Sequence, residues 1–186
     1  NKDIALEYIR NLKNRNVDGF IFSTAYYDKT LNDEITEAVA EGFPSVNLLR
    51  TDDSDVVSVA LNNAKGSELG VDYLINKGRK RIAFLQGQEY LQLYRDRFQG
   101  YRNALEKHNI EYDESLVWQG FQNGEFSAEK EVEMRLKPGL GVDAIFCASD
   151  NLAVSTLHTL SQMGYSIPED IAVIGYDNVP ISELLY

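Results

Sequence analysis

The feature that most constrains this chain is a strand–helix–strand pattern in its last third, between Asp143 and Asp177. Residues 144–148 and 171–174 are short runs without a polar side chain, as parallel strands covered on both faces should be. Between them apolar residues recur at helical spacing, and Gly164 follows as a helix stop. The pattern predicts a β-α-β crossover within an α/β fold, with parallel sheets flanked by helices.

Each of the two predicted strands ends in a small residue close to an acid. Ser149 and Asp150 follow the first strand, and Gly175, Tyr176 and Asp177 follow the second. Ligands of open α/β sheets bind outside the carboxyl ends of the strands, so these residues are candidates for a binding site. For Asp150 we expect a helix N-cap, because acids at strand-to-helix junctions often have that role. Ser149 is then the residue that faces the ligand.

These residues also resemble the lactose/galactose-repressor family of bacterial transcription regulators. The similarity includes residues 143–153 and 167–178, and four earlier segments in the family's order: Val17-Asp-Gly-Phe-Ile, Phe43-Pro-Ser-Val, residues 78–87 and residues 97–105. It implies a two-lobed, periplasmic-binding-protein-like (type I) fold in which the chain starts and ends inside the fold. Sugar-binding proteins of bacterial ABC transporters share this fold, and such a protein is the alternative function.

The resemblance also suggests how the chain divides. Residues 1–78 are expected to form an incomplete N-terminal lobe, residues 79–177 a C-terminal lobe, and residues 178–186 a crossover segment and tail. Periodicity and stop signals place the individual elements. Helices are expected over residues 3–13, 31–41, 66–77, 94–108, 128–136 and 151–163, strands over 20–23, 45–49, 56–61, 82–86 and 116–118, and a loop over 120–124.

The site residues that the resemblance implies come from both lobes. Arg97 is the principal one, because a guanidinium fork can hold two hydroxyl groups or a carboxylate. Asp177 is expected to accept hydrogen bonds from ligand hydroxyls. The other expected ligand contacts are Ser149, Phe126, Ser23 and Leu61. Where the family often has an aspartate, this chain has Leu49, which indicates a less polar ligand or a contact from Arg50.

The implied partners are a small-molecule effector and a second copy of the chain. The effector is a sugar, a sugar derivative or a purine, bound in the cleft between the lobes, and no cofactor is expected. Val154 and Leu185 are expected at the homodimer interface. Operator DNA is expected to be contacted only through a helix-turn-helix domain that these residues lack, and the location to be cytoplasmic.

Composition weighs against several other functions. With 29 acidic and 18 basic residues the net charge is −11, so this segment should repel nucleic acid phosphates. Only two histidines are present, and neither a zinc motif, a phosphate-binding loop nor a nucleophile elbow occurs, so we predict neither a metal site nor an enzyme. Cys147, the only cysteine, is predicted to be a buried thiol. No apolar run is long enough to span a membrane.

Overall fold

The computed structural model describes residues 2–15, 17–23, 29–48, 56–122, 125–126, 128–136 and 140–184. Its contacts divide the chain into two compact units. The first comprises Asn1–Leu61 and Tyr90–Leu93, and the second comprises Asn62–Glu89 and Tyr94–Tyr186. Each unit has its own parallel sheet and its own hydrophobic core, which confirms the two-lobed α/β architecture.

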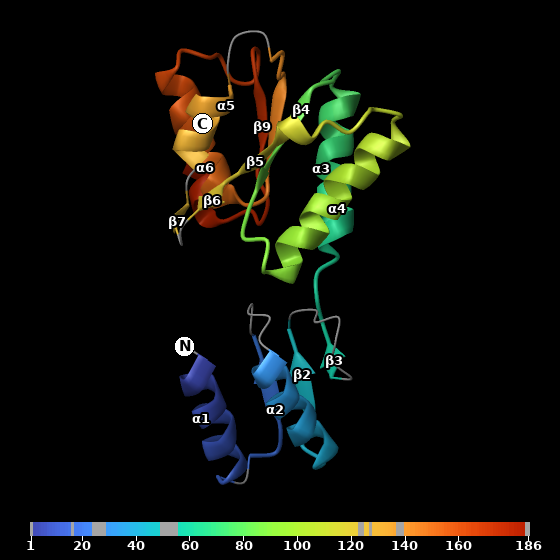
Figure 1. The fold of residues 1–186 in the computed structure, drawn as a ribbon, viewed down its shortest axis with the longest axis vertical. Coiled ribbons are helices and arrows are strands. Elements are labelled where there is room, and N and C mark those ends of the chain that lie inside the picture. The colour runs from blue at the N-terminus through green and yellow to red at the C-terminus, as the bar shows by residue number, and fades with distance from the viewer. Residues whose placement is uncertain are drawn as a thin grey trace. The chain divides into compact units, whose positions relative to one another are not determined.

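In the first unit, a parallel sheet with the strand order β1-β2-β3 packs against two helices. Its elements are α1 (Lys2–Lys13), β1 (Phe20–Phe22), α2 (Lys29–Ala40), β2 (Ser45–Asn47) and β3 (Val57–Ser58). Phe20 and Phe22 face the helices and are buried, whereas Ile21, between them, is 77% exposed. Helices of this unit therefore cover one face of the sheet only (Figure 1). The third strand is shorter than the predicted 56–61.

The second unit is built on a four-stranded parallel sheet with the order β5-β4-β8-β9. Its helices α3 and α4 lie on one face of this sheet, and α5 and α6 lie on the other (Figure 1). The elements are α3 (Asn63–Asn76), β4 (Ile82–Gln86), α4 (Gln92–Lys107), the 3-10 turn η1 (Glu114–Leu116), β5 (Val117–Gln119), β6 (Phe121–Gln122), β7 (Glu125–Phe126), α5 (Ala128–Arg135), β8 (Ala144–Cys147), α6 (Asp150–Gln162), β9 (Ala172–Ile174) and the 3-10 turn η2 (Pro180–Leu184).

The core of the second unit lies around the central strands β4 and β8, every residue of which is buried. Phe84 stacks on Phe146 of the neighbouring strand, with ring centroids 5.9 Å apart. Tyr101 of α4 is fully buried and donates a hydrogen bond of 2.9 Å to the Ile82 carbonyl. Cys147 is also fully buried, and burial raises the pKa of its thiol to about 12. The predicted buried thiol is confirmed, and at neutral pH it is protonated and a poor nucleophile.

Two features differ from the sequence-based expectation. The division between the units falls near Asn62, not near residue 78, because Val71 and Leu74 of α3 pack into the core of the second unit. The predicted loop at 120–124 is wrong in part, because β6 and β7 form a short antiparallel pair with Phe121 opposite Phe126. The two residues between these strands in the sequence are Asn123-Gly124, a dipeptide typical of two-residue hairpin turns, so a usable signal was present.

Within the described ranges, no helix combines the length and the apolar character needed to cross a bilayer. The same ranges contain no group of three or more histidine, cysteine, aspartate or glutamate side chains arranged to hold a metal ion.

Asp72 joins α3 to the end of α4 and gives the fold an acid-sensitive contact. Its carboxylate accepts hydrogen bonds from Lys107 and from His108 Nε2, the latter at 2.9 Å. Burial alone would raise the pKa of Asp72, but these two hydrogen bonds outweigh it and lower the pKa below the ordinary 3.8. The ionised carboxylate therefore stabilises the fold above the unfolded-state pKa, and this contribution disappears as the pH falls through the lower folded-state pKa.

The variant Asp72→Asn is therefore expected to lose about 1 kcal/mol of unfolding free energy at pH 7. The difference from the wild type should begin to shrink as the pH falls below the unfolded-state pKa of about 3.9, and it should disappear only below the lower folded-state pKa. Urea unfolding of the variant and the wild type at pH 7 and at pH 3 measures the difference in unfolding free energy at each pH. Glu106→Gln on the exposed side of α4 is the control. A difference that is the same at both pH values would contradict the assignment.

Candidate functional site

Arg97 of α4 lies at the centre of a polar cluster at the carboxyl edge of the second sheet. Its side chain is only 6% exposed, and its guanidinium makes four hydrogen bonds to protein atoms. Nε donates to Asn63 Oδ1 at 3.0 Å, and Nη1 donates to the Ala148 carbonyl at 2.7 Å. Asp177 accepts from Nη2 at 2.8 Å and from Nη1 at 3.4 Å. The guanidinium thus joins α3 to the ends of β8 and β9.

The loop that presents Asp177 has an unusual backbone. Asp177 has a φ of 108° and Asn178 a φ of 56°, values in the region that residues other than glycine seldom adopt. Asp150 holds this loop from both sides: its backbone N–H donates to the Tyr176 carbonyl, and its Oδ2 accepts from the Val179 N–H, both at 2.8 Å. Strained residues fixed by surrounding contacts are frequent at binding sites, and here the strain places the carboxylate against Arg97.

The structure corrects the role that we expected for Asp150. The N-cap of α6 is Ser149, and Asp150 is the first residue of the helix. Asp150 is 7% exposed, and its carboxylate accepts the hydrogen bond that holds the backbone of the Asp177 loop in place. Ser149 makes no capping hydrogen bond with its side chain, and within the described part of the chain its buried hydroxyl has no partner. A buried hydroxyl without a partner is costly unless something else satisfies it.

Two aromatic rings contact the guanidinium of Arg97. The Cζ atom of Arg97 lies 3.8 Å from the ring centroid of Tyr176 and 5.5 Å from that of Tyr94, in cation–π contact. Burial raises the pKa of the Tyr176 hydroxyl, Arg97 lowers it and Asp177 raises it, with a net increase, so Tyr176 is neutral at physiological pH. The arginine is therefore fixed both by hydrogen bonds and by stacking.

Sequence reasoning missed Asn63, the supporting role of Asp150 and the stacking of Tyr176. Tyr176 lies beside the predicted strand end, so its position in the sequence was a usable signal. Asn63 had no such signal, since it follows the helix cap Asn62 and lies 34 residues from Arg97. Only the packing of α3 against α4 brings the amide and the guanidinium together.

The other predicted site residues lie in the first unit, elsewhere in the second unit, or outside the described residues. Ser23 and Leu61 belong to the first unit, where both are exposed, Leu61 by 75%. Phe126 lies in strand β7, two residues before α5, and its side chain is outside the described part. Val154 is half-buried on α6. Leu49, Arg50 and Leu185 lie outside the described residues.

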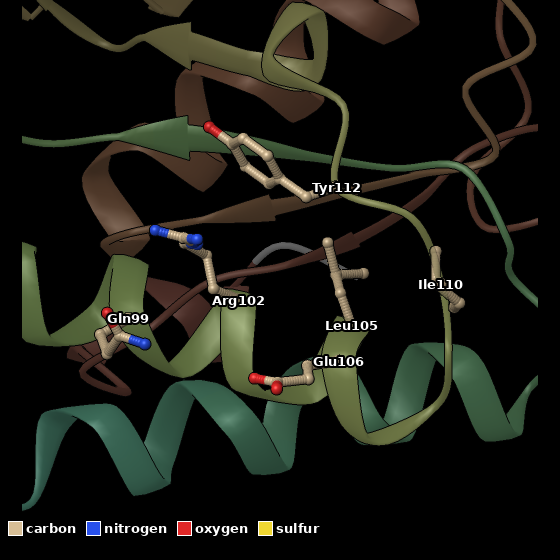
Figure 2. Close-up of a pocket in the computed structure, with 6 residues that line it drawn as sticks. All are labelled: Gln99, Arg102, Leu105, Glu106, Ile110 and Tyr112. Carbon is tan, nitrogen blue, oxygen red and sulfur yellow. The ribbon is translucent and has the colours of Figure 1, made fainter.

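A separate hollow of about 330 Å³ lies on α4 and the segment that follows it (Figure 2). In Figure 2, Arg102 and Leu105 extend from the helix on the side of Tyr112, and Gln99, Glu106 and Ile110 complete the lining. The Arg102 guanidinium lies 5.1 Å from the centroid of the Tyr112 ring. None of the predicted site residues lines this hollow, so it offers a convenient control surface for binding experiments.

Chemically, the Arg97 cluster is suited to recognition. Asp177 is the accessible member of the ion pair, with 37% of its side chain exposed, and a carboxylate has about four acceptor positions. Two of them face Arg97, and the others can accept hydrogen bonds from a ligand.

Comparison with known proteins agrees with this architecture. A family model described as a periplasmic binding protein-like domain matches residues 71–186. The HTH-type transcriptional regulator CelR of Thermobifida fusca is 34% identical over 178 residues, which cover 92% of this chain and 50% of CelR. The chain spans about half the length of the curated relatives it matches.

Solved structures of transcriptional regulators have a similar fold. A LacI-family sugar-binding transcriptional regulator from Escherichia coli, complexed with phosphate, superposes with a TM-score of 0.84 at 26% identity, covering 98% of this chain and 65% of that chain. A complex of the regulator CelR with cellobiose superposes with a TM-score of 0.83 at 32% identity, covering 96% and 54%. These relatives are named as transcriptional regulators, which favours a regulator core over a transporter protein. The chain belongs to the periplasmic binding protein-like domain family, and it is similar to the corresponding part of LacI-family regulators.

Proposed function

We propose that this chain binds a small neutral metabolite, most simply a sugar, at the carboxyl edge of its second sheet, and that binding regulates transcription. The observation that carries the proposal is the cluster of Arg97, Asp177 and the unpartnered Ser149 hydroxyl at the ends of adjacent strands. Ligands of open α/β sheets bind at this edge. The cellobiose complex of the related regulator CelR supports a sugar as the ligand.

Regulation requires a second partner, which we propose is operator DNA. The relatives are named as helix-turn-helix regulators, and this chain covers about half of their length. Its net charge of −11 disfavours direct contact with phosphates, so a separate DNA-binding domain is expected to make that contact in the intact protein. The ligand can change DNA affinity only by binding one conformation of the protein more tightly than the other, typically by about 1–3 kcal/mol.

The proposal includes the expected location and the remaining candidate contacts. A protein that acts on operator DNA in bacteria works in the cytoplasm. Binding is expected without turnover, because the relatives are named as regulators and the cluster has no nucleophile paired with a base. Ser23, Leu61 and Phe126 stay predictions as ligand contacts, which alanine variants can test.

A thermal-shift screen tests the proposed function directly. We expect cellobiose, another sugar or a purine to raise the stability of the chain by about 2.7 kcal/mol at a hundredfold excess over the Kd. The Asp177→Ala variant should lose the shift, whereas Arg102→Ala, in the hollow of Figure 2, should keep it. If the Arg102 variant loses the shift and the Asp177 variant keeps it, the ligand site lies elsewhere.

We also propose that two copies of the chain form a homodimer. Val154 is half-buried on α6, and Ile181 of η2 is 46% exposed, so apolar side chains remain available for a two-fold contact. The intact protein is expected to sediment as a dimer, and Val154→Arg should raise the dimer Kd at least about tenfold. Gln162→Arg, at the exposed end of the same helix, is the control. A wild type that is monomeric at high micromolar concentration would contradict this prediction.

A further inference from the structure

We infer that the open face of the first sheet is a docking surface for helices of the same polypeptide. The occupant is the apolar side of one or more helices, supplied by a part of the intact protein that lies outside residues 1–186. In this unit α1 and α2 pack on one face of the sheet, where Phe20, Phe22 and Val56 are buried. The opposite face, which we call the open face, is the surface in question (Figure 1).

A row of aliphatic side chains crosses the open face from strand to strand. The register places Ile21 of β1 opposite Val46 of β2, and Val46 opposite Val57 of β3. Ile21 is 77% exposed, Val57 is 67% exposed and Val46 is half-buried. Side chains alternate between the two faces along a strand, so Leu48 and Val59 continue the same surface, 44% and 64% exposed. The five side chains contain no polar atom, and four of them are largely in contact with solvent.

Such a surface is unusual for a parallel sheet. Single exposed apolar side chains are ordinary, but a contiguous patch of them marks a surface that something else covers. Parallel sheets are normally covered by helices on both faces, and their strands are rich in β-branched residues on both sides for that reason. The second unit of this chain follows the rule, with α3 and α4 on one face and α5 and α6 on the other (Figure 1). The first sheet has the side chains of a sheet covered on both faces and the helices for one face.

The length of the related proteins indicates where the covering helices come from. This chain spans about half the length of the curated relatives it matches, and 65% of the solved LacI-family chain from Escherichia coli. In those proteins, further polypeptide therefore lies outside the matched part and is available to cover a sheet. A helix is the expected occupant, because helices are what pack on the faces of parallel sheets. The inference concerns the first unit alone and does not depend on the identity of the effector.

Cysteine accessibility tests the inference on a silent background, because burial raises the pKa of the only natural thiol, Cys147, to about 12. Val57→Cys places a thiol on the open face. Val56→Cys is the matched control, since the neighbouring valine is 6% exposed and packs in the core beneath the helices. In the 186-residue chain, a maleimide should react with Val57→Cys at least about tenfold faster than with Val56→Cys. In the intact protein, both variants should react equally slowly.

Two outcomes of this comparison would overturn the inference. If Val57→Cys reacts as fast in the intact protein as in the 186-residue chain, the face is open in the complete molecule. If its protection disappears when the protein is diluted, the occupant is a second copy of the chain and not a helix of the same polypeptide.

A charge on the open face gives an independent measurement. Ile21→Lys should leave the thermal unfolding midpoint of the 186-residue chain unchanged, because the side chain there is in contact with solvent. In the intact protein the same change should lower the midpoint by several degrees, since it would bury an ammonium group without a partner. Glu7→Lys, on the exposed side of α1, is the control in both forms. An intact Ile21→Lys protein as stable as its wild type would refute the inference.

Discussion

Replacing Arg97 by alanine is expected to lower the free energy of unfolding by about 3 kcal/mol, because the change removes one member of a largely buried ion pair. It would remove the hydrogen bonds that Arg97 donates to Asn63 Oδ1, the Ala148 carbonyl and the Asp177 carboxylate. Each buried acceptor left without a partner costs about 1–3 kcal/mol, and the partial exposure of Asp177 keeps the total at the lower end. The same change should weaken ligand binding by roughly 1.5–3 kcal/mol, since Asp177 loses the group that orients it.

Urea unfolding and calorimetry separate these two effects. Arg95→Ala is the matched control, because Arg95 is an exposed arginine on the same helix that donates to the Glu89 carbonyl. Its loss should change stability by no more than about 0.5 kcal/mol. Arg97→Lys keeps the charge without the planar fork and should lie between alanine and the wild type. Equal stability of the wild type and Arg97→Ala would show that the four hydrogen bonds contribute nothing.

The strands of the second sheet were predictable because burial on both faces leaves a direct mark on sequence. Residues 144–148 and 171–174 are uninterrupted apolar runs, and β8 and β9 occur there as neighbouring parallel strands. Strand β4 was predicted with its bounds unchanged, Ile82–Gln86, for the same reason. Shorter elements such as β3 and the pair β6 and β7 contain two residues each, too few to show a period.

Arg97, Asp177 and Ser149 were named from the sequence, but the contacts that join the residues of the cluster were not predictable. A strand end followed by an acid drew attention to Asp177, and the family resemblance to Arg97. That these two bind each other, across 80 residues, follows only from the tertiary packing of α4 and from the positive φ of Asp177. Local patterns carry no information on such distant pairs, so the sequence suggested an arginine open to the ligand where the structure has one already paired.

Gly100 shows how closely the helices that hold the site approach each other. A Cβ atom on Gly100 would overlap the carbonyl oxygen of Ala64 and lie 2.7 Å from Ser67 Cβ, so α4 rests directly on the backbone of α3. Arg97 lies one turn earlier on α4, and Asn63 one residue before Ala64 on α3. The close approach at Gly100 therefore sets the distance over which Arg97 meets Asn63, 3.0 Å in the structure.

Gly100→Ala is accordingly expected to destabilise the chain by about 3 kcal/mol, because a rigid backbone carbonyl cannot move aside as a side chain can. The sign is informative, since alanine in a helix without the overlap would gain about 0.5–1 kcal/mol over glycine. Gly66→Ala on α3 is the matched control: its Cβ meets the ring and hydroxyl of Tyr176, a side chain that can rotate, so its loss should be smaller. Thermal unfolding of both variants decides the matter, and a Gly100→Ala chain as stable as the wild type would mean that α3 and α4 are less tightly packed than the structure has them.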